Sequence, residues 1–368
     1  MNVHDGGFKE EKLAFIDPDQ AEKLSNVELF PGDVLINITG ASVARCCIVD
    51  ASVLPARVNQ HVSILRPVQN LILPQYLQYF LISPGAKSLL LKIGEQGATR
   101  QAITKSQLQD FEINHPKNLT KQEEIVEVLD KAFAAIDQAK ANIEQNIANA
   151  KELFQSKLNQ IFSQKGEGWV ETTLGDGSEF RNGVNFSKNS KGESVKVVGV
   201  GDFKNRFWTP LDALKHKVIN GKLNPRDSLE EGDILFVRSN GNKKLIGRCM
   251  LVGPIKQQVT HSGFTIRMRN SGDTHFPPYI CWYLKSETIR ATLTGGGSGA
   301  QISNLNQGAL SSLGIRIPPL SVQKRTVEEI DSLSGIIQEI IGHYERRFAS
   351  LEELKKSILQ KAFAGELT

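Results

Sequence analysis

The pattern of apolar positions predicts two long helices, one near the end of each half of the chain. Residues 122–162 contain neither proline nor glycine, and their apolar residues recur at spacings of four and three. A second run with the same spacing covers residues 330–358. A seam of this kind needs a partner that buries it, so we expect the two helices to pair as an antiparallel coiled coil. The predicted core positions are Ile125, Leu129, Ile136, Ile143, Ile330, Ile337, Tyr344 and Leu351, with polar Asn146 and Arg347 in matching core slots.

The two predicted helices are long for the globular segments beside them. Each predicted helix holds about 40 residues, which gives about 60 Å of helix at about 1.5 Å per residue. One run precedes the second globular segment and the other follows it. Antiparallel pairing would therefore place the globular segments at opposite ends of a rod. The alternative is that each helix packs only on its own globular segment.

The globular segments mix short strands with helices. Buried strands are predicted at residues 34–38 and 233–237, and an alternating strand at residues 260–269. Helices that begin at a proline are predicted at residues 74–81 and 278–284. The predicted fold class is therefore α+β, with two mixed α/β domains and two long helices.

The two halves of the chain repeat one another. GDVL at residues 32–35 matches GDIL at 232–235, PQYLQY at 74–79 matches PYICWY at 278–283, and SKL at 156–158 matches SIL at 357–359. A period near 200 residues is too long for a solenoid and indicates a duplicated domain. We expect one domain at residues 1–120, a helix at 121–168, a second domain at 169–320 and a second helix at 321–368.

The first domain is expected to be incomplete at its start. The second domain begins at Trp169, about 30 residues before GVGD at residues 199–202, whereas the corresponding NVHD lies at residues 2–5. The first domain is therefore predicted to lack the opening strands that correspond to residues 169–198.

Composition adds information mainly through charge. The formal net charge is +4, but residues 169–320 carry 20 Lys and Arg against 12 Asp and Glu, a local charge of +8. A local excess of this kind is typical of a surface that binds a polyanion. No apolar run approaches the ~20 residues that span a bilayer, and Met1 is not followed by a signal-peptide pattern, so we expect a cytoplasmic protein without a membrane partner. The four cysteines lack metal-binding spacing and are expected to be reduced thiols, which predicts no metal site.

Polar residues in loops are the candidates for contacts with DNA. Phosphates are bound by Lys, Arg, Ser, Asn and backbone amides, and base edges by Arg, Asn, Gln and Lys. Taken singly, each candidate could equally be a solvated loop residue, and the cluster at residues 238–244 is the least ordinary because it combines three cations with two Asn residues. The candidates in the second domain are Lys204, Asn205, Arg206, Arg238, Ser239, Asn240, Asn242, Lys243, Lys244 and Gln301, and those in the first are Thr39, Ser42, Arg100 and Gln101.

The order of globular unit, proline-containing linker and heptad helix, given twice, resembles the specificity subunit of Type I restriction-modification systems. The motifs behind this resemblance are GDVLI and GDILF, GATRQ at 97–101, GAQ at 299–301, PPLSVQ at 318–323, and the helix ends SKLNQIF and SILQKAFAGEL. The resemblance covers essentially the whole chain. The first linker reads NHPKNLTKQ where the family has a proline pair, which predicts a looser start for the first helix.

The resemblance implies a function and a set of partners. Each globular unit would be a target recognition domain that reads one half of a bipartite double-stranded DNA site through the major groove. The helices would set the gap between the half-sites and dock two methyltransferase subunits, which restriction subunits then join. The chain itself would have no active site and no cofactor, because S-adenosylmethionine, ATP and Mg²⁺ would belong to its partner subunits.

Two other functions stay open on the residues alone. FPPY at residues 276–279 superficially resembles the Asn/Asp-Pro-Pro-Tyr motif of adenine methyltransferases, but Phe cannot accept a hydrogen bond from the target amino group. Neither a glycine-rich cofactor loop nor a catalytic constellation accompanies this motif. The other alternative is a coiled-coil scaffold, or a truncated specificity protein without competent DNA binding.

Overall fold

The computed structural model describes residues 2–95, 101–204, 206–293 and 304–366. The chain forms two compact units: unit 1 contains residues 1–146 and 343–368, and unit 2 contains residues 147–342. Each unit combines a globular α+β part with half of each long helix. The boundary between the units therefore falls within both long helices. The sequence prediction placed each helix in a segment of its own.

Unit 1 contains the first copy of the repeat. Its strands are β1 (Val3–His4), β2 (Gly7–Phe8), β3 (Val34–Asn37), β4 (Cys46–Ile48) and β5 (Val62–Leu65). Its helices are α1 (Pro18–Lys23), α2 (Pro74–Ile82), α3 (Pro84–Glu95), α4 (Lys105–Gln109) and the first part of α5 (Leu119–Phe162). A short 3-10 helix, η2 (Gly40–Ser42), follows β3.

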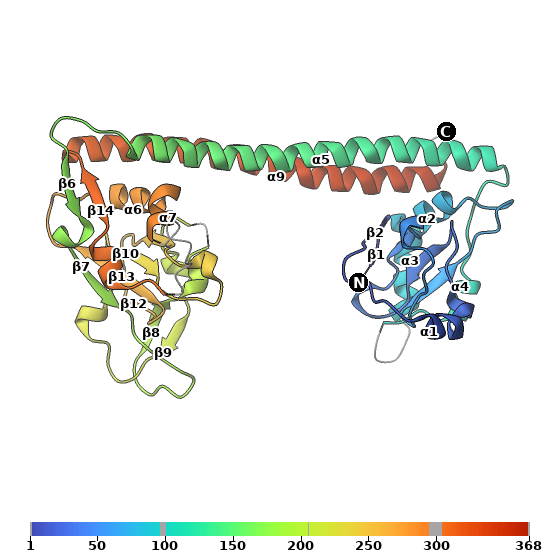
Figure 1. Cartoon of the computed structure of the whole chain (residues 1–368), viewed down its shortest axis with the longest axis horizontal. Coiled ribbons are helices and arrows are strands. Elements are labelled where there is room, and N and C mark those ends of the chain that lie inside the picture. The colour runs from blue at the N-terminus through green and yellow to red at the C-terminus, as the bar shows by residue number, and fades with distance from the viewer. Residues whose placement is uncertain (1, 96–100, 205, 294–303, 367–368) are drawn as a thin grey trace. The chain divides into compact units, whose positions relative to one another are not determined.

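The centre of unit 1, the blue part of the chain in Figure 1, is an antiparallel sheet with the strand order β4-β3-β5. Every residue of β3 is buried, because Val34 and Ile36 pack into one hydrophobic core and Leu35 packs into another. Leu77 and Leu81 of α2 pack into the same core as Val34 and Ile36 of β3. Helix α2 begins at Pro74, a position where proline costs no helical hydrogen bond.

Unit 2 contains the second copy. Its strands are β6 (Val170–Thr173), β7 (Ser178–Asn182), β8 (Ser194–Val198), β9 (His216–Val218), β10 (Ile234–Val237), β11 (Cys249–Leu251), β12 (Val259–His261), β13 (Thr265–Asn270) and β14 (Gly314–Ile317). Its helices are α6 (Pro277–Lys285), α7 (Glu287–Leu293), α8 (Gln307–Ser311) and the first part of α9 (Leu320–Ala364). The 3-10 helices used below are η5 (Val200–Asp202), η6 (Leu211–Ala213) and η8 (Lys243–Leu245).

Unit 2 repeats the central sheet and adds two others. β10 pairs with β11 and β13 as β3 pairs with β4 and β5, and β7 adds a fourth strand to give the order β11-β10-β13-β7 (Figure 1). A second sheet has the order β12-β8-β9, and a third pairs β14 with β6. Among the described residues of unit 1, no counterpart of β6, β7, β8 or β9 precedes β3.

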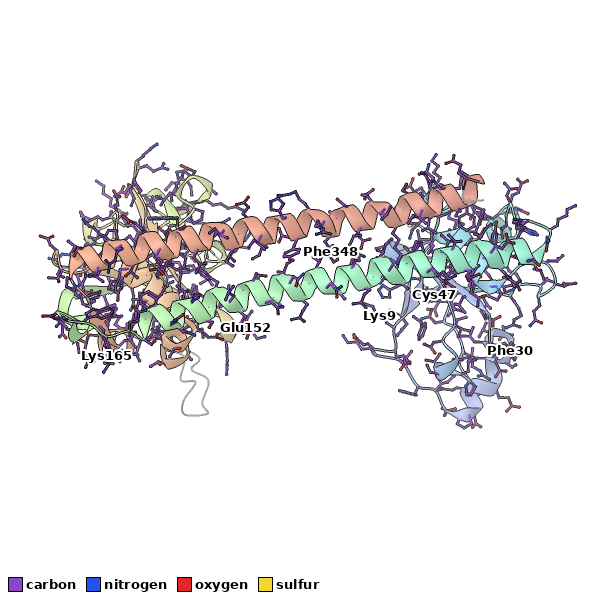
Figure 2. The ribbon with its side chains drawn as sticks, turned by 90° about the horizontal axis from the view of Figure 1, so that it is seen from above. Lys9, Phe30, Cys47, Glu152, Lys165 and Phe348 are labelled. Carbon is purple, nitrogen blue, oxygen red and sulfur yellow. The ribbon has the colours of Figure 1, made fainter. Side chains whose placement is uncertain are left out.

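The long helices pair in an antiparallel direction within unit 1. Lys140 on α5 forms an ion pair with Glu352 on α9, and Lys355 on α9 lies 3.4 Å from Asp137 on α5. Increasing residue numbers on one helix thus meet decreasing numbers on the other. Phe348, labelled in Figure 2, lies on the side of α9 that faces α5, with the Lys140 ammonium 5.1 Å from its ring centroid.

The structure buries or half-buries every predicted apolar position of the seam, but not the two polar positions. Asn146 and Arg347 are exposed, and so is Leu354, which lies three residues beyond the predicted core position Leu351. The strict pattern is wrong there because the seam shifts to Leu359 and Ala362, which pack against α2 as well as α5. The structure buries Ile125, Leu129, Ile136, Ile143, Ile330 and Ile337, and half-buries Tyr344 and Leu351.

One strand prediction differs from the structure in detail. Residues 260–269 form two strands, β12 and β13, because the chain turns at residues 262–264. All four cysteines are buried free thiols. Along the described parts of the chain, the helices are either too short or too polar to cross a membrane.

Candidate nucleic-acid interface

The loop after β10 is built on a turn from the neighbouring strands. The amide of Arg238 donates to the carbonyl of Phe264 at 2.9 Å, and the Arg238 guanidinium reaches the carbonyl of Gly263 at 3.4 Å. The turn is itself fixed from below, because the Thr265 hydroxyl donates to the carbonyl of Ser262 at 2.7 Å and lies 2.9 Å from Nδ1 of His261. The first candidate cation of the loop is therefore held in place by backbone contacts.

The two Asn residues of this loop shape its backbone. Oδ1 of Asn240 accepts from the amide of Asn242 at 2.8 Å, and Oδ1 of Asn242 accepts from the amide of Lys244 at 3.1 Å and caps η8. Their carbonyl ends are thus already used within the loop. Lys243 and Lys244 are exposed at its tip, where their ammonium groups can reach a polyanion.

The structure brings the second candidate cluster next to this loop. Arg248, which follows the loop, donates to the carbonyl of Lys204 at 3.0 Å, and Lys285 donates to the carbonyl of Arg206 at 2.7 Å. Phe207 stacks on Trp282 of α6 with ring centroids 4.3 Å apart. These contacts anchor residues 204–208 to the sheet and to α6. Lys204 and Arg206 remain exposed, and Asn205 lies outside the described residues.

The chain returns to the end of the central strand after each glycine-containing segment. The amide of Leu305 donates to the carbonyl of Arg238 at 2.8 Å, and the amide of Ile103 donates to the carbonyl of Ile38 at 2.8 Å. The same anchor therefore occurs in both units. Two candidates in these segments, Gln301 and Arg100, lie outside the described residues, whereas Gln101 is described and exposed.

In unit 1 the segment after β3 is bonded to neighbouring residues. The Thr39 hydroxyl lies 2.7 Å from Nδ1 of His61, and the amide of Gly40 donates to the carbonyl of Gln101 at 3.0 Å. Ser42 is buried at 4% exposure, so its selection as a DNA contact was wrong. Its hydroxyl faces the protein interior because η2 turns the side chain inward.

Sequence reasoning missed two residues at this surface. Phe264 is 63% exposed beside Arg238, and His61 occupies the corresponding place in unit 1, where the amide of Ile38 donates to its carbonyl at 2.9 Å. An exposed aromatic ring beside cations is typical of nucleic-acid surfaces. The repeat could have revealed these residues. When the two copies are aligned, His61 lies directly before β5 and Phe264 directly before β13, which are corresponding strands.

Polar side chains are also buried around strands β10, β12 and β13 of unit 2. Arg269 holds Asp233 through two bonds, Nε to Oδ1 at 2.7 Å and Nη2 to Oδ2 at 2.8 Å, and this contact raises the pKa of Arg269. Burial, with Arg267 and other guanidinium groups nearby, lowers the pKa of His261 to about 3. His261, which is 0% exposed, is therefore a neutral structural side chain at ordinary pH.

The FPPY segment forms the start of helix α6. Phe276 is its N-cap residue, and its amide donates to Oε1 of Gln323 at 2.8 Å. The Tyr279 ring is buried against Phe162 at the end of α5. This segment therefore has a structural role, in agreement with the sequence interpretation. Among the residues the structure describes, no group of His, Cys, Asp and Glu side chains is arranged to hold a metal ion.

Comparison with known proteins identifies the family. Residues 11–149 and 166–343 match the family described as Type I restriction modification DNA specificity domain. The chain belongs to this family. It is 25% identical over 399 residues to the EcoKI specificity subunit of Escherichia coli K12, a match that covers 100% of this chain and 81% of that protein. It is 23% identical over 377 residues to the putative MjaX specificity subunit of Methanocaldococcus jannaschii, covering 97% and 83%.

Solved structures show the same α+β fold. A chain from a study of complex assembly and conformational transition of the type I R-M system has a TM-score of 0.75 at 17% identity, covering 92% of this chain and 83% of that one. The HsdS subunit of Thermoanaerobacter tengcongensis has a TM-score of 0.55 at 16% identity, covering 92% and 82%. The specificity-subunit fold therefore extends over both units of the chain.

Proposed function

We propose that this chain is the DNA sequence-recognition subunit of a Type I restriction-modification complex and has no active site of its own. The observation that carries the proposal is the repeated construction at the end of the central strand. In each unit that strand is followed by a polar loop, and a later segment returns to the same strand end through one backbone hydrogen bond. In unit 2 the loop presents exposed Lys243 and Lys244 beside Lys204 and Arg206.

The partners follow from this role. Each unit reads one half of a bipartite target in double-stranded DNA, and α5 and α9 dock two methyltransferase subunits, which restriction subunits join. S-adenosylmethionine, ATP and Mg²⁺ act in those partners, within the cytoplasm. The exposed apolar residues Leu153 and Ile336 on the long helices of unit 2 support a docking role, because isolated helices in water gain nothing from exposing them.

The test is DNA binding and methylation by the chain co-expressed with its methyltransferase. We expect methylated adenines at one bipartite sequence and binding to that duplex that weakens steeply with salt. K243Q/K244Q should weaken binding, whereas K256Q, at an exposed lysine in another turn of unit 2, should not. A complex that binds every duplex equally, or none, would overturn the proposal in favour of a coiled-coil scaffold.

A further inference from the structure

Strands β8 and β9 of the sheet β12-β8-β9 belong to a small lobe at residues 184–223 of unit 2, which we call the lysine lobe. It has a core of its own, in which Val195 and Val197 of β8 pack against Ile219 and Leu223. Residues 184–223 contain eight Lys and Arg against three Asp and Glu, a local charge of +5. Five lysines of the lobe, Lys188, Lys191, Lys215, Lys217 and Lys222, were not among the candidates that the sequence suggested.

Backbone hydrogen bonds bring five exposed lysines together on this lobe. The amide of Gly221 donates to the carbonyl of Lys191 at 3.1 Å, which places Lys191 beside Lys222. Lys217 pairs with Val195 across the β8–β9 ladder, and the carbonyl of Lys215 accepts from the amide of Val197 at 3.3 Å. The turn before Lys191 adds Lys188 through the bond from the Ser190 amide to the Ser187 carbonyl at 3.2 Å.

The charge of these lysines is not neutralised within the described residues. None of the five forms an ion pair there, and all are exposed. Of the nearby carboxylates, that of Glu193 is turned inward, where it accepts from the amide of Leu223 at 2.9 Å. Asp212, in η6, is the exposed carboxylate closest in sequence to β9. The five ammonium groups thus outnumber the available carboxylates.

Protection of a sheet edge explains only part of this arrangement. Lysines on an edge strand discourage pairing with other chains, and β9 is the edge strand of its sheet. That role accounts for Lys215 and Lys217. It does not account for Lys188, Lys191 and Lys222, which lie in turns outside β9.

The lobe is continuous with the candidate base-reading surface. β8 leads through η5 directly to Lys204 and Arg206. The amide of Ser262 donates to the carbonyl of Val198 at 2.9 Å, so the end of β8 contacts the turn that carries Phe264. The phosphate backbone of a duplex that contacts the loops at Arg238 and Phe264 would therefore lie within the electrostatic field of the lysines of this lobe.

We propose that the lysine lobe binds the phosphate backbone of DNA without regard to sequence and adds affinity to the loops that read bases. This inference rests on the proposed function. Among the described residues of unit 1, no strands correspond to β8 and β9, so the proposal concerns unit 2 alone.

The experiment compares salt dependence for the full chain with its methyltransferase partner. The variant K191Q/K215Q/K217Q removes three charges from exposed positions, and K191R/K215R/K217R keeps them. Each lost phosphate contact should reduce the slope of log K against log salt by about 0.9, so we expect a slope shallower by about 2 to 3 and binding weaker by roughly 10- to 100-fold. The ratio of target to non-target affinity should stay unchanged, and the Arg variant should restore the slope.

A charge-matched control uses exposed lysines elsewhere, K9Q/K105Q/K256Q, which should leave the slope near that of the wild type. An unchanged slope in the lobe variant, with target binding intact, would overturn the inference and leave the proposed function standing. A changed preference for target sequence at constant slope would also overturn it, because the lobe would then read bases. Absence of DNA binding by the wild-type complex would instead refute the proposed function.

Discussion

Gln122 and Gln323 make the same three hydrogen bonds at the starts of the two long helices. Oε1 of Gln323 accepts from the amide of Phe276 at 2.8 Å, and its Nε2 donates to the carbonyls of Thr274 and Pro318, both at 2.8 Å. Gln122 does the same with the amide of Leu73 and the carbonyls of Leu71 and Pro116, at 2.8 to 2.9 Å. Both side chains are 0% exposed. Each glutamine thus joins a long helix to the globular part of its unit.

The first prediction follows from the burial of these groups. Q323A should lower the free energy of unfolding by about 2 to 5 kcal/mol, because three polar groups lose their partner inside the protein. Urea unfolding followed by circular dichroism measures this change. Q360A, at an exposed glutamine of α9, should change it by less than about 0.5 kcal/mol. Equal effects of the two substitutions would mean that the buried bonds contribute nothing.

The equivalence of these two glutamines also corrects one sequence prediction. The first linker lacks the proline pair and was expected to give a looser helix start, but Gln122 makes the full set of bonds there. The sequence did reveal the helices, their seam and the repeat, because these depend on spacing alone. It could not reveal that Asn146 and Arg347 are exposed, because spacing alone does not show which heptad positions meet the partner helix.

The second prediction concerns the ion pair of Asp233 with Arg269. Oδ2 of Asp233 accepts both from the Arg269 guanidinium and from the amide of Glu230 at 2.7 Å, and the Asp233 side chain is 1% exposed. D233A should lower the free energy of unfolding by about 2 to 4 kcal/mol, since it leaves a partly buried guanidinium without its carboxylate. Urea unfolding tests this expectation. E230Q, which alters the other partner of Arg269 at 64% exposure, should cost under about 1 kcal/mol.

The third prediction is a pH dependence that originates at His261. Its pKa of about 3 lies below the value of about 6.5 for an unfolded chain, since burial and the neighbouring Arg267, Arg181 and Arg269 oppose its charge more than Asp227 favours it. The unfolded chain therefore takes up a proton between these values that the folded chain refuses. Stability is full above pH 6.5 and falls as the pH falls, by about 2 kcal/mol between pH 7 and pH 5.

The variant H261N isolates this contribution. Asparagine can still bond to the Thr265 hydroxyl but does not titrate, so the loss between pH 7 and pH 5 should shrink by about 2 kcal/mol relative to the wild type. Other groups titrate equally in both proteins and cancel in the comparison. Urea unfolding at the two pH values gives the difference directly, and parallel curves for the two proteins would contradict the assignment to His261.

The candidate DNA surface was only partly accessible from the sequence. Residue type identified the loop at 238–244, because cations and Asn residues are concentrated there. Residue type also selected Ser42, which is buried, and passed over Phe264, which is exposed. Exposure in these cases depends on the chain turn between β12 and β13 and on η2, and neither has a strong local signature.

The last prediction tests Phe264. Its ring is 63% exposed and its backbone, not its side chain, holds Arg238, so F264A should change the free energy of unfolding by less than about 0.5 kcal/mol. Loss of an apolar contact with a base or a sugar should weaken binding of the target duplex by about tenfold.

The control for F264A is F15A, a substitution of an aromatic residue of unit 1 that is 93% exposed. Gel-shift titration of the full complex should show weaker target binding for F264A and wild-type binding for F15A. The salt slope should not change in either variant, because no phosphate contact is removed. Wild-type affinity in F264A would place the base-reading surface elsewhere in unit 2, whereas a shallower slope would show that the substitution had displaced the Arg238 loop.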